Sequence, residues 1–199
     1  MGAPFDGATI VAAHRARAGG SIEDAIAPHH SKRCKNSPLS EGTIPIVAKS
    51  IPDGYHAVTP YLSLRGAAAA LDFYKRAFGA TEILRIPGPE GTIGHAEIRI
   101  GDSPIMLADE FAEMEFLSPL SRGGTTVHIH LYVEDADATL GQAVAAGGTL
   151  KRPARDEFYG DRTGTVEDPF GHVWHIATHQ EDLSPEELHR RAEHAMKKP

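Results

Sequence analysis

The chain has 199 residues, of which 41% are hydrophobic and 24% charged, and its formal net charge at pH 7 is −7. These values are typical of a folded protein of one ordinary domain or two small ones, and they disfavour chains that are disordered throughout, collagen-like or coiled-coil. The negative charge disfavours nonspecific binding to nucleic acid. The longest apolar stretch, Ala67–Leu71, is too short to span a bilayer.

The single cysteine, Cys34, cannot form an internal disulfide and excludes zinc sites that need several thiolates. No basic segment leads into a long apolar core near Met1, so we expect no secretory signal. We therefore expect a cytoplasmic protein with neither nucleic acid nor a membrane as its partner.

The first fifty residues differ in composition from the rest. They hold six Lys or Arg against four Asp or Glu, no Trp or Tyr, and a single Phe. Such a stretch has too little apolar surface to offset the entropy lost on ordering. We predict a flexible N-terminal extension over residues 1–51.

Regular patterns begin at Val58. Polar and apolar residues alternate over Val58–Leu64, which predicts a half-buried strand. Apolar residues recur at helical spacing over Ala67–Phe78, and Gly79 can end that helix. Three further strands follow between turns, over Thr81–Ile86, Thr92–Ile100 and Ser103–Ala108. Residues 57–110 are thus predicted to form a βαβββ module.

The same order of elements recurs in residues 125–179. Thr126–Val133 alternates like a strand, and Asp135 can cap a following helix that ends at Gly147. Three more strands are predicted over Thr149–Pro153, Thr163–Glu167 and His172–Thr178. The glycines that end the two helices, Gly79 and Gly147, lie 68 residues apart, which indicates two fused modules rather than a repeat array.

A last helix is predicted over residues 184–197. Ser184 and Glu187 form a capping box, and Pro185 stands at the first helical position. The predicted fold class is therefore α+β: two tandem βαβββ modules that make one domain over residues 55–180, with the N-terminal extension and a C-terminal helix.

Several motifs resemble those of the vicinal oxygen chelate superfamily, which groups glyoxalase I, bleomycin resistance proteins and extradiol dioxygenases. They are Phe73-Tyr74, Phe78-Gly79-Ala80 and the turn Glu167–His172. Three more resemble the PhnB-like branch of that superfamily: Gly94–Glu97, Met106–Glu110 and Phe158–Arg162. The resemblance covers about residues 55–180 and implies paired βαβββ modules. Its functional implication is broad, because one scaffold serves isomerases, dioxygenases, thiol transferases and metal-free binders.

In each predicted strand one face is apolar and suits a covering helix, while the other is polar and suits a concave site. Three strands carry ordered polar faces: Thr59, Tyr61 and Ser63; His95, Glu97 and Arg99; His128, His130 and Tyr132. The alternative is that these faces are simply solvated.

In metal-using relatives, one ligand comes from each of four strands. The resemblance places these positions at Thr59, Met106, His128 and His175. Only His128 and His175 are good ligands for a divalent ion, and Glu97 or His95, whose strand adjoins the site, can add a further ligand, as in a set of two histidines and a carboxylate. The alternative is that both histidines are hydrogen-bonding residues of a cavity.

His95 and Glu97 leave the same strand face, because they are two residues apart. A carboxylate beside an imidazole fixes its tautomer, which suits a catalytic base, but the two also fit a structural polar pair. The further candidates are ligand-binding residues: Thr59, Tyr61, Arg99, His130, Tyr132, Phe158, Tyr159 and Arg162.

Two functions remain open at this point. The first is a protein of the bleomycin resistance kind that binds a small molecule and needs no cofactor. The second is a metal-dependent enzyme, a glyoxalase-type isomerase or lyase or a dioxygenase, in which His128 and His175 hold zinc, nickel, iron or manganese. Because each small open sheet has exposed edges, we also expect a homodimer.

Overall fold

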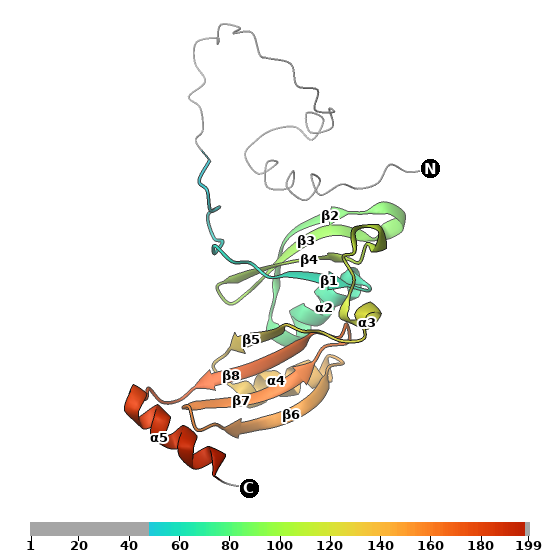
Figure 1. Ribbon diagram of the computed structural model, residues 1–199. Coiled ribbons are helices and arrows are strands. Elements are labelled where there is room, and N and C mark those ends of the chain that lie inside the picture. The colour runs from blue at the N-terminus through green and yellow to red at the C-terminus, as the bar shows by residue number, and fades with distance from the viewer. Residues whose placement is uncertain (1–47, 198–199) are drawn as a thin grey trace, which may run out of the picture. The chain divides into compact units, whose positions relative to one another are not determined.

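The computed structural model describes residues 48–197 (Figure 1). The predicted extension over residues 1–51 lies almost wholly outside the described residues and stays a prediction. Residues from Ile51 onward form one unit, which is described below.

The first module consists of five regular elements: β1 (Tyr61–Leu64), α2 (Ala67–Phe78), β2 (Thr81–Pro87), β3 (Ile93–Ile100) and β4 (Ser103–Asp109). Its four strands form one mixed sheet in the order β1-β4-β3-β2. β1 runs parallel to β4, and the other neighbours are antiparallel. A 3₁₀ turn, Pro89–Gly91, joins β2 to β3.

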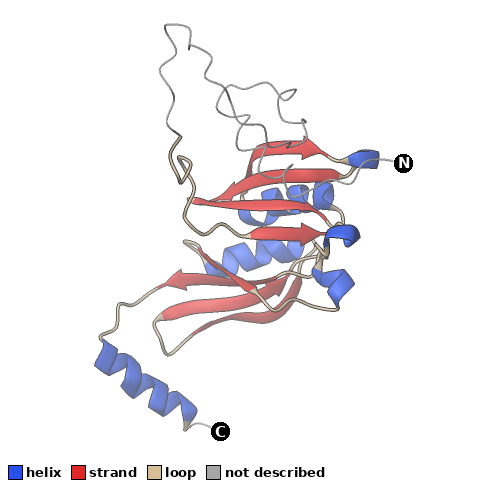
Figure 2. Cartoon of the chain, turned by 45° about the horizontal axis from the view of Figure 1, so that its top comes forward, coloured by secondary structure: helices blue, strands red, loops and turns tan. Residues whose placement is uncertain are grey.

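The second module repeats this topology with β5 (His128–Tyr132), α4 (Ala136–Ala145), β6 (Thr149–Asp156), β7 (Asp161–Glu167) and β8 (Val173–His179). Its sheet has the order β5-β8-β7-β6, again with one parallel pair, β5 and β8. The predicted α+β fold of tandem βαβββ modules is confirmed. Each module places its helix against one face of its own sheet, as Figure 2 shows for α2 behind the first sheet.

Helix α2 has the length that its pattern predicts, and a distant aspartate and a nearby glycine fix its two ends. Asp109 Oδ1 accepts hydrogen bonds from the backbone N–H of Gly66 and Ala67, at 2.9 and 2.8 Å, and so satisfies donors of the first turn. Gly79 ends the helix in the left-handed region, with φ of 65°.

The two modules share one hydrophobic core. Helices α2 and α4 pack against each other, and an aromatic cluster joins α2 to β8, with the ring of Trp174 4.6 Å from that of Phe78 and 5.5 Å from that of Tyr74. Trp174 and Tyr74 are fully buried. Burial of each large side chain contributes roughly 1.5–3 kcal/mol, so the cluster holds the modules together.

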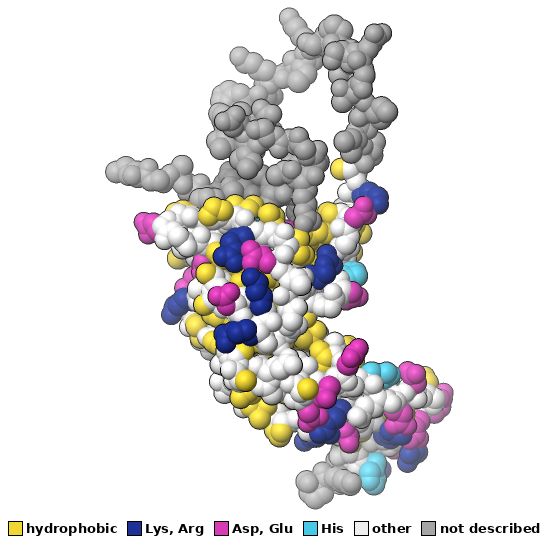
Figure 3. Space-filling view, turned by 180° about the vertical axis from the view of Figure 1, so that it is seen from behind, with side chains coloured by type: hydrophobic (Ala, Val, Ile, Leu, Met, Phe, Trp, Pro, Cys, Tyr) yellow, Lys and Arg dark blue, Asp and Glu magenta, His cyan; other side chains and the backbone are white. Residues whose placement is uncertain are grey.

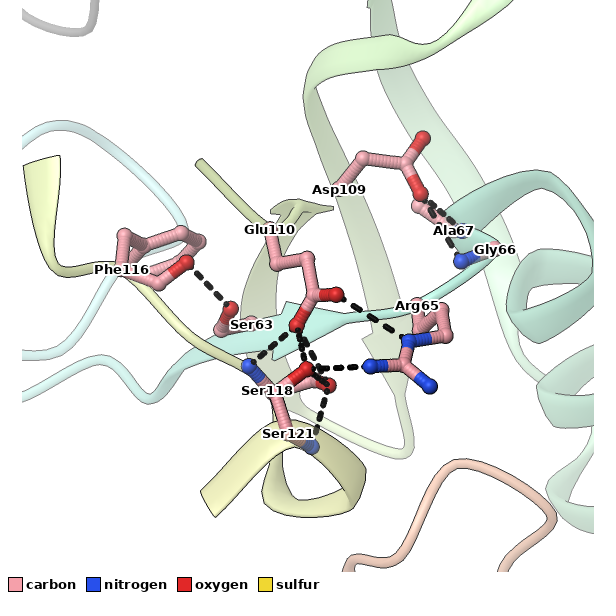
Figure 4. Close-up of polar contacts among 9 residues, drawn as sticks. All are labelled: Ser63, Arg65, Gly66, Ala67, Asp109, Glu110, Phe116, Ser118 and Ser121. Atoms are coloured by element: carbon pink, nitrogen blue, oxygen red, sulfur yellow. Dashed lines mark hydrogen bonds and ion pairs between the residues drawn. The ribbon is translucent and has the colours of Figure 1, made fainter. Parts of the chain in front are cut away.

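Between the modules, Glu110 anchors a short connecting helix, α3 (Pro119–Arg122), that the sequence did not predict (Figure 4). Its Oε2 accepts hydrogen bonds from the backbone N–H of Ser118 at 3.0 Å and from the Ser118 and Ser121 hydroxyls at 2.7 and 2.6 Å. Its Oε1 accepts a bond from Arg65 Nε at 3.1 Å. These bonds, that of Ser121 first, lower the pKa of Glu110 to about 2.

The C-terminal helix α5 (Pro185–Met196) begins at Ser184, whose hydroxyl accepts a hydrogen bond from Glu187 N as the capping box predicts. It buries no residue fully, and acidic and basic side chains intermix on its surface (Figure 3). Arg191, for example, pairs with Glu181 and Glu187. Within residues 48–197, no helix is both long and apolar enough to cross a membrane.

Four strands differ from the prediction by two or more residues, and one of them, β7, starts at Asp161 rather than Thr163. β1 starts at Tyr61 rather than Val58, because the preceding residues turn away: Val58 is 85% exposed, and the Thr59 hydroxyl donates to the His56 carbonyl. β5 likewise starts two residues late, at His128. β6 runs on through Pro153, which an edge strand tolerates because it can spare an N–H.

Helix α4 buries a narrow stripe of three residues. Ala136, Leu140 and Ala143 are buried, but Val144 is 42% exposed. This helix packs closely on its sheet at Gly164 of β7. A Cβ atom at that position would lie 2.3 Å from a methyl carbon of Leu140 in α4, so a larger residue does not fit without a shift.

Candidate functional site

Each sheet leaves the side opposite its helix without a helical cover, and these two open sides carry the candidate residues. We call the first face 1, defined by Tyr61, His95, Glu97, Arg99 and Met106. The strand register brings these together, since Met106 lies beside both Tyr61 and Glu97. Leu84 and Ile86 of β2 lie opposite Glu97 and His95, so face 1 is polar at its centre and apolar around it.

His95 and Glu97 form a buried polar pair on face 1. They are only 3% and 2% exposed, and His95 Nε2 lies 3.2 Å from Glu97 Oε1. His95 Nδ1 lies 3.2 Å from the Tyr61 hydroxyl, and the hydroxyl of Tyr55 donates a hydrogen bond to Glu97 Oε2. Burial raises the pKa of Tyr61 to about 12, so its phenol stays neutral at physiological pH. The pair is therefore hydrogen-bonded to two tyrosine hydroxyls, with Tyr61 at the imidazole and Tyr55 at the carboxylate.

Arg99 lies on the same face, and its guanidinium donates hydrogen bonds to two backbone carbonyl oxygens. Its Nη1 donates to Asp102 O at 3.0 Å and to Gly54 O at 3.2 Å, and its Nη2 donates to Gly54 O at 3.2 Å. Residues 54 and 55 thus both reach face 1. Thr59, by contrast, lies before β1, and its hydroxyl donates a hydrogen bond to the His56 carbonyl oxygen.

The second open side is face 2, defined by His128, His130, Tyr132, Thr165 and His175. Adjacent parallel strands place His130 beside His175. His128 Nδ1 lies 2.9 Å from His175 Nε2, and Thr165 Oγ1 lies 3.1 Å from His175 Nδ1. Burial, and then the nearby His128, His130 and Arg152, lower the pKa of His175, so its ring favours the neutral form.

At the far end of face 2, Tyr132 joins a network that the sequence analysis missed. Its hydroxyl donates to Asp161 Oδ2 at 2.9 Å, and Asp161 Oδ1 lies 2.7 Å from His179 Nδ1. His179 Nε2 in turn lies 3.0 Å from Asp182. The hydrogen bond to Asp161, and then that to Asp182, raise the pKa of His179. The alternation that placed His175 on this face also places His179 there, four residues on, so the signal was present.

The aromatic residues of the turn between β6 and β7 lie beside face 2. Phe158 and Tyr159 make an edge-to-face contact with ring centroids 5.3 Å apart, and the Tyr159 hydroxyl reaches Thr163 Oγ1 at 3.5 Å. Both rings remain more than one third exposed. They can therefore meet a ligand that enters from this side.

Arg162 does not lie on face 2. It stands between Asp161 and Thr163 in the alternation of β7, so its side chain leaves the sheet on the side of α4. There it forms ion pairs with Asp137 of α4 and with Asp156. The expectation that Arg162 meets a ligand rested on its place near a turn, and the strand that begins at Asp161 gives it a structural partner instead.

The residues at the four metal-ligand positions do not fit a catalytic metal centre. The register makes Thr59 equivalent to His128 and Met106 equivalent to His175, since Tyr61 pairs with Met106 as His130 pairs with His175. Thr59 has only a hydroxyl and lies outside the strand, and Met106 has only a thioether, so His128 and His175 are the two good ligands among the four positions. Catalytic metal sites use about three protein ligands. Across residues 48–197, no three His, Cys, Asp or Glu side chains are grouped so as to hold a metal ion.

Nor do the residues expected to complete the set stand beside His128 and His175. His95 and Glu97 belong to face 1, where they bond to each other and to two tyrosines. The structure therefore separates these four candidate metal ligands into two pairs: His95 with Glu97 on the first sheet, and His128 with His175 on the second.

Residues 56–176 match the family model described as the Glyoxalase/Bleomycin resistance protein/Dioxygenase superfamily. Among similar proteins, "Uncharacterized protein Rv0887c" from Mycobacterium tuberculosis is 42% identical over 135 residues, which cover 66% of this chain and 79% of that protein. "Uncharacterized protein Mb0911c" from Mycobacterium bovis is also 42% identical over 135 residues, covering 66% of this chain and 89% of the relative.

Solved structures give the same fold. The X-ray structure of the gene product At5g48480 from Arabidopsis thaliana is 27% identical, with a TM-score of 0.51, and the match covers 62% of this chain and 98% of that one. The protein PA1353 from Pseudomonas aeruginosa is 24% identical, with a TM-score of 0.51 and the same coverage, and supports the fold alone.

Proposed function

Because the chain belongs to the glyoxalase/bleomycin resistance protein/dioxygenase superfamily, we propose that it binds a small molecule on its open sheet faces without a metal ion. The observation that carries this proposal is the chemistry of the four equivalent positions. His128 and His175 have Thr59 and Met106 as their counterparts, and neither side chain is a good ligand for the divalent ions that this fold uses. A binder tolerates both residues.

The two faces suit an amphipathic ligand with a ring. Face 1 offers a carboxylate, an imidazole and a guanidinium among Leu84, Ile86 and Met106, which is the mixture of apolar wall and few polar groups that ligand sites use. Face 2 offers imidazoles and hydroxyls with the rings of Phe158 and Tyr159 at its edge. The neutral phenol of Tyr61 can exchange hydrogen bonds without the cost of burying a charge.

Assembly as a homodimer is part of this proposal. Face 2 is open, with Tyr132 60% exposed, and in a symmetric dimer the same face of each copy can pack against that of the other. The cytoplasmic location and the PhnB-like branch, which rest on the cysteine count and on motifs, belong to the proposal as well.

The alternative is a metal-dependent enzyme of the superfamily. One observation favours it: two imidazole nitrogens, His128 Nδ1 and His175 Nε2, converge at 2.9 Å on face 2. This candidate ranks second, because further protein ligands are needed and the described part of the chain groups none with them.

A ligand screen tests the first proposal. The full chain, labelled with ¹⁵N and treated with a chelator, is screened by NMR against small aromatic and amphipathic compounds. We expect shifts to cluster at amides of β1, β3 and β4, or of β5 and β8, with chelator present. If compounds bind only after a divalent ion is restored, or if no compound shifts either sheet, the proposal is wrong.

A further inference from the structure

Face 1 is covered in part by the chain itself. The segment Pro52–Tyr55, which we call the strap, turns back on itself through a hydrogen bond of 3.1 Å from Tyr55 N to Pro52 O, shortly before the chain enters β1 (Figure 1). Two residues of the strap form hydrogen bonds with face 1. The Tyr55 hydroxyl donates to the Glu97 carboxylate, and the Gly54 carbonyl oxygen accepts from the Arg99 guanidinium. The two central polar groups of face 1 thus meet a hydroxyl and a carbonyl oxygen from the same short segment.

Gly54 shows how closely the strap fits. Its φ of +80° lies in the left-handed region, and a Cβ atom there would lie 3.1 Å from Arg99 Nη2. Only glycine adopts this conformation without strain and leaves room for the guanidinium. The carbonyl oxygen of Gly54 therefore meets both terminal nitrogens of Arg99.

The residues of the strap are mostly exposed, although they form hydrogen bonds with Glu97 and Arg99. Ile51 is 48% exposed, Pro52, Asp53 and Gly54 are exposed, and only Tyr55 is partly buried. By contrast, Glu97 and His95 beneath it are almost fully buried. Segments with exposed backbone and few apolar contacts open locally at a small cost in free energy, so the strap can leave without unfolding the sheet.

We propose that face 1 binds a hydroxylated aromatic carboxylate, and that the strap occupies this site in the free protein as an internal competitor that the ligand displaces. This rests on the proposed function and names its ligand class and regulation. The ligand's hydroxyl replaces that of Tyr55 at Glu97, and its carboxylate replaces the Gly54 carbonyl at Arg99. A guanidinium binds a carboxylate more strongly than a neutral carbonyl, which favours the ligand over the strap.

Tyr55→Phe is the direct test, since it removes the competing hydroxyl and keeps the ring. The probe is 4-hydroxyphenylacetate, titrated into the full chain and followed by NMR. When a site is only partly available, the apparent dissociation constant rises in proportion, so weakening the strap must tighten binding. We expect roughly tenfold tighter binding to Tyr55→Phe than to the unmodified chain, as one hydrogen bond to a charged group predicts. Val58→Ala, an exposed neighbour at 85%, should change the affinity less than about twofold.

Two analogues of the probe show whether its hydroxyl and its carboxylate each contribute to binding. Phenylacetate, which lacks the hydroxyl, and 4-methylphenol, which lacks the carboxylate, should each bind Tyr55→Phe about tenfold more weakly than the probe does. Hydrogen exchange at the Tyr55 amide, which is bonded to Pro52, should speed up when the probe binds the unmodified chain.

Unchanged probe affinity in Tyr55→Phe, or slower exchange at Tyr55 with probe, would show a permanent structural cover and overturn the inference. So would failure of the probe to bind either protein. The proposed function survives these results if other compounds shift face 1 or face 2 in the screen, and it fails separately if none does.

Discussion

The hydroxyl of Tyr74 in α2 donates a hydrogen bond of 2.8 Å to Asp168 Oδ2 in the turn between β7 and β8. Asp168 is 3% exposed and accepts three further bonds, from Trp174 Nε1 and from the backbone N–H of Phe170 and His172. Each oxygen thus receives two donors, and one donor comes from the other module. Burial and the neighbouring carboxylate raise the pKa of Tyr74 well above its usual value, so the phenol remains a donor.

Tyr74→Phe should lower the free energy of unfolding by about 1–2 kcal/mol, because a buried carboxylate loses one donor. Asp168→Asn should cost more, about 3 kcal/mol, since an amide group turns a donor toward groups that themselves donate. Denaturant unfolding followed by Trp174 fluorescence measures both. Tyr159→Phe, whose hydroxyl makes only a 3.5 Å contact, serves as control and should stay within about 0.5 kcal/mol. Equal effects of Tyr74→Phe and the control would show that the bond between modules adds nothing.

Glu110 should make the module connection sensitive to acid. Its folded-state pKa is about 2 against an ordinary value of 4.5, so its stabilisation is complete above pH 4.5 and is lost as the pH falls toward about 2. Glu110→Gln should therefore lower stability near neutral pH by about 1–2 kcal/mol, and the difference from the unmodified chain should shrink below pH 4.5. Thermal unfolding across this range measures it. Glu113→Gln, at an exposed position, is the control, and a difference that persists at about pH 2 contradicts the assignment.

His179 should titrate above the ordinary value of 6.5, because it bonds to Asp161 and Asp182. Since its folded-state pKa is raised, its contribution to stability is present below pH 6.5 and is lost as the pH rises through the folded value. A ¹H NMR titration of the ring proton reads the pKa directly. We expect Asp182→Asn to move the pKa back toward 6.5 and Glu193→Gln to leave it unchanged. An unmodified protein in which His179 titrates below 6.5 rules this out.

Light scattering tests the homodimer. We expect twice the chain mass at micromolar concentration, because face 2 and the sheet edges are open in the single chain. Tyr132→Glu, which puts a charge at a 60% exposed position of face 2, should shift the equilibrium toward monomer if face 2 lies in the interface. A monomer at all concentrations contradicts the prediction.

Most of the fold follows from local patterns. Helix α2 has the bounds that its periodicity and Gly79 predict, and the alternation of β8 places Trp174 in the core and His175 on the open side. These features depend on residues a few positions apart, so a single sequence reveals them. α3 was missed because four residues carry no periodic signal.

The site was less predictable, because its contacts join distant residues. Nothing near Tyr55 in the sequence indicates that it reaches Glu97, 42 positions away. Arg162 was expected to meet a ligand because it follows Gly160-Asp161, but the sequence pattern did not show that it belongs to β7 and forms ion pairs with Asp137 and Asp156. The pairing of His128 with His175 was predicted, yet only the strand register shows that His95 and Glu97 form a separate group.

Metal analysis of the untagged protein by mass spectrometry separates metal-free binding from the metal-dependent alternative, with His128→Ala as the matched variant. Metal-free binding predicts no stoichiometric zinc, nickel, iron or manganese in either protein. It also predicts that His128→Ala costs at most one hydrogen bond in ligand affinity, about 0.5–1.5 kcal/mol. A near-stoichiometric divalent ion that survives purification and disappears in His128→Ala would contradict it and establish the metal-dependent alternative.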